Sequence, residues 1–154
     1  MHHRAAEFVE QARERYDLEP TVEEFPQGTK TAADAAEAVG CDVGQIASSL
    51  VFDADDDLVV VVTSGANRVD ESRLAAHLDV ADVSMADPDA IAEVVGWSIG
   101  GVPPICHETD VPVFLDESLL THETVWAAAG TPSAVFPIEP DELERLSGAT
   151  PIEV

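Results

Sequence analysis

The stretch that decides the fold is residues 45–65, QIASSLVFDADDDLVVVVTSG. Two largely apolar runs, QIASSLVF and LVVVVTSG, each have the length of a strand and are separated by the acidic segment DADDD. Apolar runs of this length that are bounded by turn signals are typical of strands buried inside a sheet. We therefore predict two adjacent strands, joined by a charged hairpin, at the centre of the sheet.

The aspartates of this hairpin do not predict a metal site. Asp53, Asp55 and Asp57 have the spacing that begins a calcium-binding loop. However, Leu58 stands where such a loop requires glycine, and Ser64 stands where it requires glutamate. We expect the protein to use neither a metal nor a cofactor.

Helices and further strands are predicted on both sides of the hairpin by periodicity, caps and turn residues. We expect helices over residues 5–15, from a Thr31 cap to Gly40, after Asp70, after Asp87 and over 140–148, strands over 21–25, 112–116, 124–128 and 133–136, and a turn at Gln27 and Gly28. Because strands and helices do not alternate strictly, we predict an α+β (mixed α/β) fold with a mixed, mostly antiparallel sheet surrounded by helices. The chain, 1–154, is expected to form one domain, with residues 1–20 as a helical extension and with Trp97 and Trp126 in its core.

Residues 96–107, GWSIGGVPPICH, predict a shaped loop, which we call the glycine loop. Gly100 and Gly101 can adopt backbone angles barred to other residues, and Pro103 and Pro104 exclude a helix or a central strand. Backbone amides at two glycines can approach a small polar ligand closely, because no side chain intervenes. The glycine loop is therefore predicted either to bind such a ligand or to be a plain surface turn. In the first case, alanine at Gly101 is expected to impair binding and to spare the fold.

The chain is acidic throughout. Its 154 residues include 31 Asp and Glu but only 7 Lys and Arg, Lys30 is the sole lysine, and the net charge is -24. Such a surface suits a salt-rich, halophilic cytoplasm, because the Debye length falls to about 3 Å at molar ionic strength and the repulsion is screened. The sequence offers no basic patch for a nucleic-acid backbone, so we expect no DNA binding.

Cysteine usage and hydropathy indicate a reducing compartment. Cys41 and Cys106 have no CxxC partner, so neither a disulfide framework nor a zinc site is predicted. No apolar run approaches the roughly 20 residues of a membrane span, and the N-terminus has no apolar signal core. We expect a cytoplasmic protein without a membrane partner.

Four segments together resemble the YbaK/ProX family of aminoacyl-tRNA deacylases, the free-standing relatives of the editing domain in bacterial prolyl-tRNA synthetases. They are the Thr31 cap with its alanine-rich helix, QIASSL at 45–50, GWSIGGVPP in the glycine loop, and Asp116 after an apolar strand. The resemblance implies the YbaK fold and a hydrolase that cleaves the ester of a small mischarged amino acid on tRNA without a cofactor. The implied partners are the aminoacylated acceptor end of tRNA and an aminoacyl-tRNA synthetase.

The resemblance also implies a set of site residues. The GxxxP part of the glycine loop, residues 100–104, grips the aminoacyl ester, while a bound water and the free hydroxyl of the terminal ribose carry out the hydrolysis. Backbone amides suit this role because they are preorganised donors for the charge that develops on the carbonyl oxygen. The expected catalytic set is Ser48, Gly100 and Gly101, which the resemblance indicates, together with His107, which can transfer a proton near neutral pH. The expected substrate-binding set is Thr31, Ser49, Pro104 and Asp116.

Two positions depart from the family pattern. The family usually carries a lysine where this chain has Ser48, which keeps a hydroxyl but not the charge. Cys106 stands where the loop usually has glycine. Ser48 leaves open an alternative, a catalytically impaired module that binds aminoacyl-tRNA or a small aminoacyl ligand. The role of His107 has two alternatives as well. It either contacts the substrate or transfers a proton, or it is a loop histidine held by hydrogen bonds to the backbone.

Overall fold

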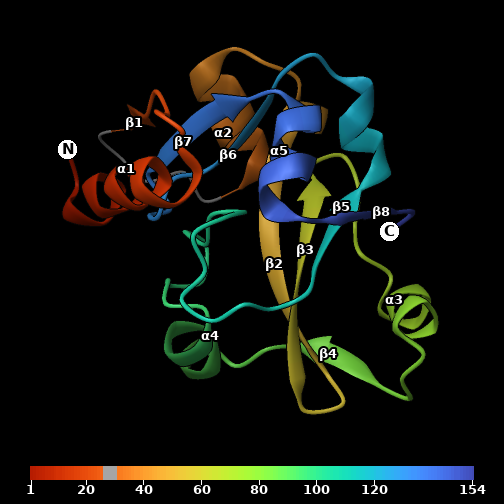
Figure 1. Ribbon diagram of the computed structural model, residues 1–154. Helices are drawn as coiled ribbons and strands as arrows, with labels where there is room; N and C mark the ends of the chain where they lie inside the picture. Colours follow the sequence, from red (N-terminus) through yellow and green to blue (C-terminus); the bar gives the residue numbers. More distant parts are fainter. Residues whose placement is uncertain (26–30) are drawn as a thin grey trace.

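The computed structural model describes residues 1–25 and 31–154, which form a single-domain mixed α/β fold (Figure 1). Lys30 and the turn expected at Gln27 and Gly28 lie outside the described residues. The helices are α1 (His3–Tyr16), α2 (Ala32–Val39), α3 (Glu71–Leu78), α4 (Pro88–Val94) and α5 (Pro140–Ser147), with two short 3-10 helices, η1 (Val43–Gln45) and η2 (Glu117–Thr121). The strands are β1 (Glu23–Glu24), β2 (Ile46–Ala54), β3 (Asp57–Ser64), β4 (Val83–Met85), β5 (Val113–Asp116), β6 (Val125–Ala128), β7 (Ala134–Ile138) and β8 (Thr150–Ile152).

The hairpin of β2 and β3 is the centre of the sheet, as predicted. The strand order is β1-β7-β6-β2-β3-β5-β8, and β4 pairs with β2 as well. The two hairpin strands pair from Ala47 opposite Ser64 down to the turn. Asp55 and Asp56 close that turn with φ values of 56° and 75°. Positive φ at both central residues matches the right-handed twist of the strands they connect.

The sheet combines both kinds of strand pairing. The pairs β1–β7, β2–β3, β2–β4 and β6–β7 are antiparallel, and the pairs β2–β6, β3–β5 and β5–β8 are parallel. The predicted fold class is therefore confirmed. The sequence does not predict β4 or β8, because each has three residues, too few to show an alternating pattern.

The helix starts predicted at Thr31, Asp70 and Asp87 coincide with side-chain caps. Thr31 Oγ1 accepts a hydrogen bond from the N–H of Asp34 at 3.1 Å. Asp70 Oδ1 accepts from the N–H groups of Ser72 and Arg73 at 2.9 and 3.1 Å. These bonds satisfy backbone donors that have no partner inside the first helical turn. The Thr31 cap thereby fixes where α2 begins beside β2.

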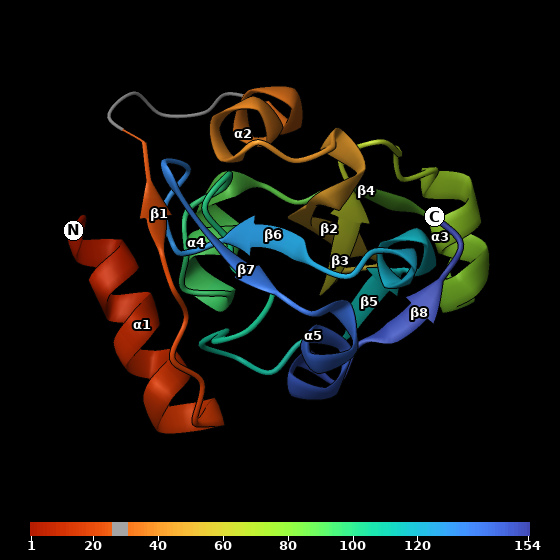
Figure 2. The ribbon, with the colours of Figure 1, turned by 90° about the horizontal axis from the view of Figure 1, so that it is seen from above.

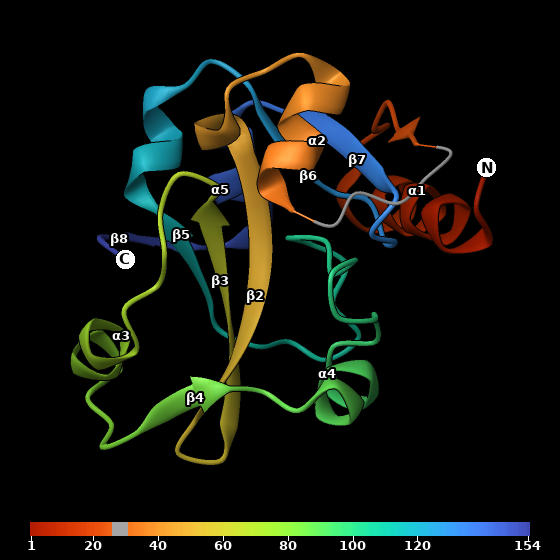
Figure 3. The same cartoon turned by 180° about the vertical axis from the view of Figure 1, so that it is seen from behind.

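The helices lie around the sheet. Figure 2 shows α1 on the outside, beside β1 and β7, and Figure 3 shows α2 and α4 on the same side of β2. The main core is built on large buried side chains that include Phe8, Trp97, Leu115, Phe136 and Leu143. None of the helices within residues 1–25 and 31–154 is long and apolar enough to cross a membrane.

Candidate functional site

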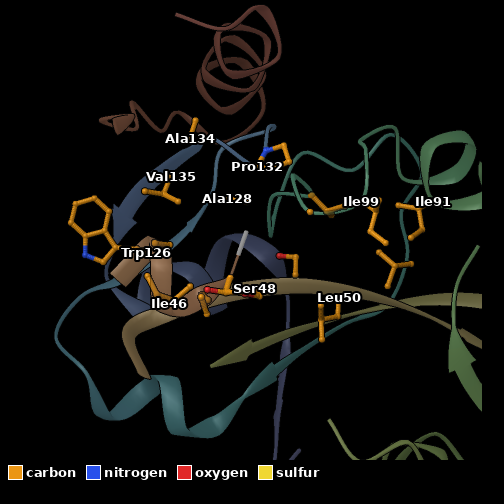
Figure 4. A pocket seen from close by; sticks show the side chains of 18 of the residues that line it. Ile46, Ser48, Leu50, Ile91, Ile99, Trp126, Ala128, Pro132, Ala134 and Val135 are labelled. Carbon is orange, nitrogen blue, oxygen red and sulfur yellow. The ribbon is translucent and has the colours of Figure 1, made fainter. Parts of the chain in front are cut away.

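A pocket of about 330 Å³ lies over a gap in the pairing of β2 (Figure 4). On this edge, β2 pairs with β6 at Ile46 and Ala47, and with β4 from Phe52 to Ala54. Between those two ladders no other strand of residues 1–25 and 31–154 pairs with this edge of β2, so in the described part of the chain the edge is open toward the pocket. The labelled walls in Figure 4 are Ile46, Ser48, Leu50, Ile91, Ile99, Trp126, Ala128, Pro132, Ala134 and Val135.

The backbone of Ser49 faces this gap. The carbonyl of Ile46 accepts a hydrogen bond from the N–H of Gly65 on the β3 side at 2.8 Å. The carbonyl of Val51 accepts one from the N–H of Ala86 on the β4 side at 3.1 Å. Since peptide groups alternate between the two edges of an antiparallel strand, the N–H and C=O of Ser49 point to the same side as those of Val51. The open edge therefore presents one donor and one acceptor to the pocket.

The side chain of Ser49 adds a second unusual feature. In the part of the chain that the structure describes, Ser49 Oγ is the single buried side-chain oxygen or nitrogen without a hydrogen-bond partner. Buried polar atoms are nearly always paired, and an unpaired one costs free energy. Because Ser49 lines the pocket, a bound molecule or water can supply the missing partner.

Among the described residues that line the pocket, none has an ionisable side chain. This is notable in a chain of which 25% is Asp, Glu, Lys or Arg. The wall consists of aliphatic side chains and Trp126, with the hydroxyls of Thr31, Ser48 and Ser49 as its polar groups. Apolar walls with a few placed polar groups are typical of small-molecule sites. An ionised side chain would lose its hydration here without gaining a counter-charge.

The two glycines of the glycine loop are placed differently. Gly100 lines the pocket with a φ of 87°, and its N–H has no acceptor among the described residues. Gly101 is buried, and its N–H donates to the carbonyl of Ser98 at 3.0 Å. A Cβ on Gly101 would lie 2.7 Å from the Cα of Thr131. The expectation that Gly101 is a loop glycine whose substitution spares the fold is therefore corrected, since Gly101 packs against backbone.

Pro104 and His107 of the glycine loop do not line the pocket. Both are buried, and His107 is 6% exposed. His107 Nε2 lies 2.8 Å from the carbonyl oxygen of Pro103. Because a carbonyl only accepts, Nε2 is the protonated ring nitrogen. Burial lowers the pKa of His107, and the nearby Arg15 lowers it further, while the bond to Pro103 and Asp110 act in the opposite direction.

The lowered pKa of His107 predicts a pH dependence of stability. Its folded-state pKa lies below the unfolded value of about 6.5, so between these two values the unfolded chain binds more protons. This contribution is fully present above about pH 6.5 and is lost as the pH falls toward the folded-state pKa. We expect the free energy of unfolding, measured by urea denaturation, to fall less steeply between pH 7 and 5 in His107→Gln, which keeps an N–H donor. Equal slopes in both proteins would contradict this assignment.

Thr31 lines the pocket, but Asp116 does not. Asp116 is 2% exposed and lies where β5 ends. Its carboxylate accepts hydrogen bonds from Ser64 N, Asn67 Nδ2, Ser118 N and Ser118 Oγ at 2.8–3.1 Å. Burial alone would raise the pKa of Asp116, but these bonds outweigh it and leave the pKa below its usual value. In this structure Asp116 joins the ends of β3 and β5.

Trp126 is a pocket residue that the sequence reasoning placed in the core. It is half-buried and packs beside Ile46, and its side chain forms part of the pocket wall (Figure 4). The strand Val125–Ala128 alternates, with Val125 and Ala127 buried and with Trp126 and Ala128 on the other face. This period of two is the signal that separates Trp126 from the core.

Of the eight predicted site residues, the structure brings four to the pocket: Thr31, Ser48, Ser49 and Gly100. They come from the start of α2, from β2 and from the glycine loop. Elsewhere in the described residues, no group of three or more His, Cys, Asp or Glu side chains is placed to hold a metal ion.

Comparisons with known proteins agree with this architecture. The chain is 29% identical over 133 residues to the uncharacterised YwhH protein of Bacillus subtilis (strain 168), covering 86% of this chain and 85% of YwhH. It is 30% identical over 90 residues to a proline–tRNA ligase of Lysinibacillus sphaericus (strain C3-41), covering 58% of this chain but 16% of the ligase. This chain therefore matches a small part of the ligase.

A solved structure is similar along nearly the whole chain. A crystal structure described as that of a proposed trans-editing enzyme for prolyl-tRNA synthetase has a TM-score of 0.94 and 38% identity, and the match covers 99% of this chain and 97% of that one. The family model for the aminoacyl-tRNA editing domain matches residues 26–146. The resemblance to YbaK-type deacylases is thus confirmed, and the chain belongs to the family of aminoacyl-tRNA editing domains.

Proposed function

We propose that this protein is an aminoacyl-tRNA deacylase that acts in trans and hydrolyses the ester of a small, uncharged amino acid on tRNA. The observation that supports this proposal is a pocket over the open edge of β2 whose described lining residues carry no charge, in a chain of the editing-domain family. In the reaction, the oxygen of a water adds to the ester carbonyl carbon and the bond to the ribose oxygen breaks. The products are the free amino acid and the tRNA hydroxyl, which takes up the proton lost by the water.

Different groups of the pocket are proposed to bind the amino acid and to stabilise the charge that develops during hydrolysis. The apolar wall holds the amino-acid side chain and excludes a charged one, because the ion would not be solvated there. In this proposal the N–H groups of Ser49 and Gly100 stabilise the negative charge on the carbonyl oxygen, and a donor of this kind is worth about 3 kcal/mol in other enzymes. The C=O of Ser49 is an acceptor for the amino group. The attacking water and the free ribose hydroxyl complete the site without a covalent nucleophile.

The proposed partner is the aminoacylated acceptor end of tRNA. A protein with 7 Lys and Arg neutralises few phosphates, so its affinity for tRNA is expected to depend weakly on salt. Recognition then rests on the amino acid and the terminal nucleotide. An aminoacyl-tRNA synthetase is the source of the mischarged tRNA, since synthetases separate similar small amino acids by only about a hundredfold.

A panel of charged tRNAs tests the proposal. One tRNA is charged in turn with alanine, serine, leucine, aspartate and lysine, and release of each amino acid is measured in about 2 M and in about 0.1 M KCl. We expect hydrolysis at least tenfold above the spontaneous rate for one or more of the small uncharged amino acids, and none for aspartate or lysine, because the described residues of the pocket wall carry no counter-charge.

Two results would overturn this function. Spontaneous rates for every charged tRNA would exclude a deacylase. Saturable binding of aminoacyl-tRNA without turnover would indicate the binding module that Ser48 leaves open. Gain of hydrolysis by Ser48→Lys in an inert parent would support that alternative further.

A further inference from the structure

α1 contacts both ends of the glycine loop. The guanidinium group of Arg4 donates a hydrogen bond to the carbonyl oxygen of Gly96, the first residue of the glycine loop. Arg15 Nη1 donates to the carbonyl oxygen of His107, its last residue, at 3.0 Å. The chain has only 7 Lys and Arg, and two of them bind these two carbonyl groups.

Further contacts from α1 hold the interior of the glycine loop. The guanidinium carbon of Arg4 lies 4.1 Å from the ring centroid of Trp97. Phe8 meets the same ring edge-on, with centroids 6.3 Å apart. Trp97 is 2% exposed, and a Cβ on Gly130 would lie 2.7 Å from its ring and 2.8 Å from the carbonyl oxygen of Arg4. α1, Trp97 and Gly130 are therefore packed so closely that a side chain larger than hydrogen at position 130 could not be accommodated without a shift.

The glycine loop contains one residue, Cys106, in a left-handed backbone conformation, and contacts with α1 help to maintain it. Cys106 has a φ of 67°, which is unfavourable for a residue with a Cβ. Its N–H donates to the hydroxyl of Tyr16 at 3.4 Å, and its carbonyl accepts from Trp97 Nε1 at 2.9 Å. Such a conformation persists where the surrounding structure fixes it. Tyr16 belongs to α1, so α1 takes part in fixing it.

We propose that Arg4 and Arg15 are positioning residues, through which α1 holds the glycine loop at the distance from β2 that sets the width of the pocket. The proposal rests on the function proposed above for that pocket. α1 lies outside residues 26–146, the span of the editing-domain model. Release of the two loop ends moves Ile99 and Gly100, which line the pocket, relative to the fixed edge of β2.

The test compares Arg4→Ala/Arg15→Ala with Arg13→Ala. Arg13 is on the same helix, but it is exposed and its ion pair is with Glu19, at 3.5 Å. We expect amide hydrogen exchange of residues 98–107 to be at least tenfold faster in the double variant and unchanged in Arg13→Ala, while exchange in β2 and β3 stays protected. Arg15→Lys, which keeps a charged donor, is expected to restore part of the protection.

The catalytic readout is the selectivity for amino-acid size, which simple loss of folded protein does not change. The ratio of kcat/KM for alanyl-tRNA to that for leucyl-tRNA is expected to fall at least tenfold in the double variant, because a wider pocket excludes leucine less. Unchanged exchange of residues 98–107 in a folded double variant would overturn the proposal, whether or not the protein is a deacylase. If the double variant does not fold, Arg15→Ala and Arg15→Lys give the same comparison singly. Exchange changes without any wild-type hydrolysis would reject the function but retain the positioning role.

Discussion

Gly101→Ala is expected to lower the free energy of unfolding by about 2–3 kcal/mol, the usual cost of forcing extra volume into a packed site. The new Cβ would lie 2.7 Å from Thr131 Cα and 2.9 Å from Thr131 N. Backbone atoms cannot move aside as a side-chain end can, so the glycine loop must shift away from the turn between β6 and β7. In a domain of this size the melting temperature should fall by roughly 5–10 °C, measurable by circular dichroism.

Gly148→Ala is the matched control for this steric effect. Gly148 ends α5 with a φ of 68°, and a Cβ there would meet no atom within 4 Å. Its substitution costs only the left-handed backbone conformation, about 1–2 kcal/mol. Gly101 does not have a positive φ, so its cost is purely one of contact. A Gly101→Ala protein that is as stable as wild type would show that the glycine loop is not packed on Thr131.

The parts of the fold that could be predicted from sequence are those with local causes. The β2–β3 hairpin follows from two apolar runs around an acidic turn, and the helix starts follow from caps such as Thr31 and Asp70. The gap in β2 has no local cause. It exists because β6 stops pairing after Ala47 and β4 begins only at Phe52, and both partners come from distant segments.

Residues of the pocket could be predicted where they lie in a recognisable sequence motif. They could not be predicted where hydrogen bonds to distant residues determine the position of the side chain. Ser48, Ser49 and Gly100 lie in the segments on which the family resemblance rests, although Ser48 itself departs from the family pattern, and all three line the pocket. Asp116 lies in such a segment too and His107 lies shortly after one, but each forms hydrogen bonds with neighbouring groups of the fold, and those partners cannot be read from residue types. Ser49 stands out in the structure because its Oγ lacks a partner, a property that a sequence does not show.

Ala128→Leu is expected to lower kcat/KM for a tRNA charged with a small amino acid by about 10- to 200-fold. This is the range by which one added or missing methylene group changes kcat/KM in a tight apolar pocket. Ala128 lies on β6 and forms part of the pocket wall (Figure 4). Leucine adds three carbon atoms to a space of about 330 Å³ that must also hold the amino acid and a water. The added group enters open space, so the free energy of unfolding should change by less than about 1 kcal/mol.

Ala76→Leu serves as the control, because Ala76 is exposed on α3 and does not line the pocket. It makes the same chemical change at a surface position and is expected to keep wild-type kcat/KM. The comparison uses single-turnover release of alanine from alanyl-tRNA, so that product release does not mask the chemical step. A folded Ala128→Leu protein with wild-type kcat/KM would place the aminoacyl group outside this pocket. The open edge at Ser49 would then need another ligand, because its donor and acceptor face the same space as Ala128.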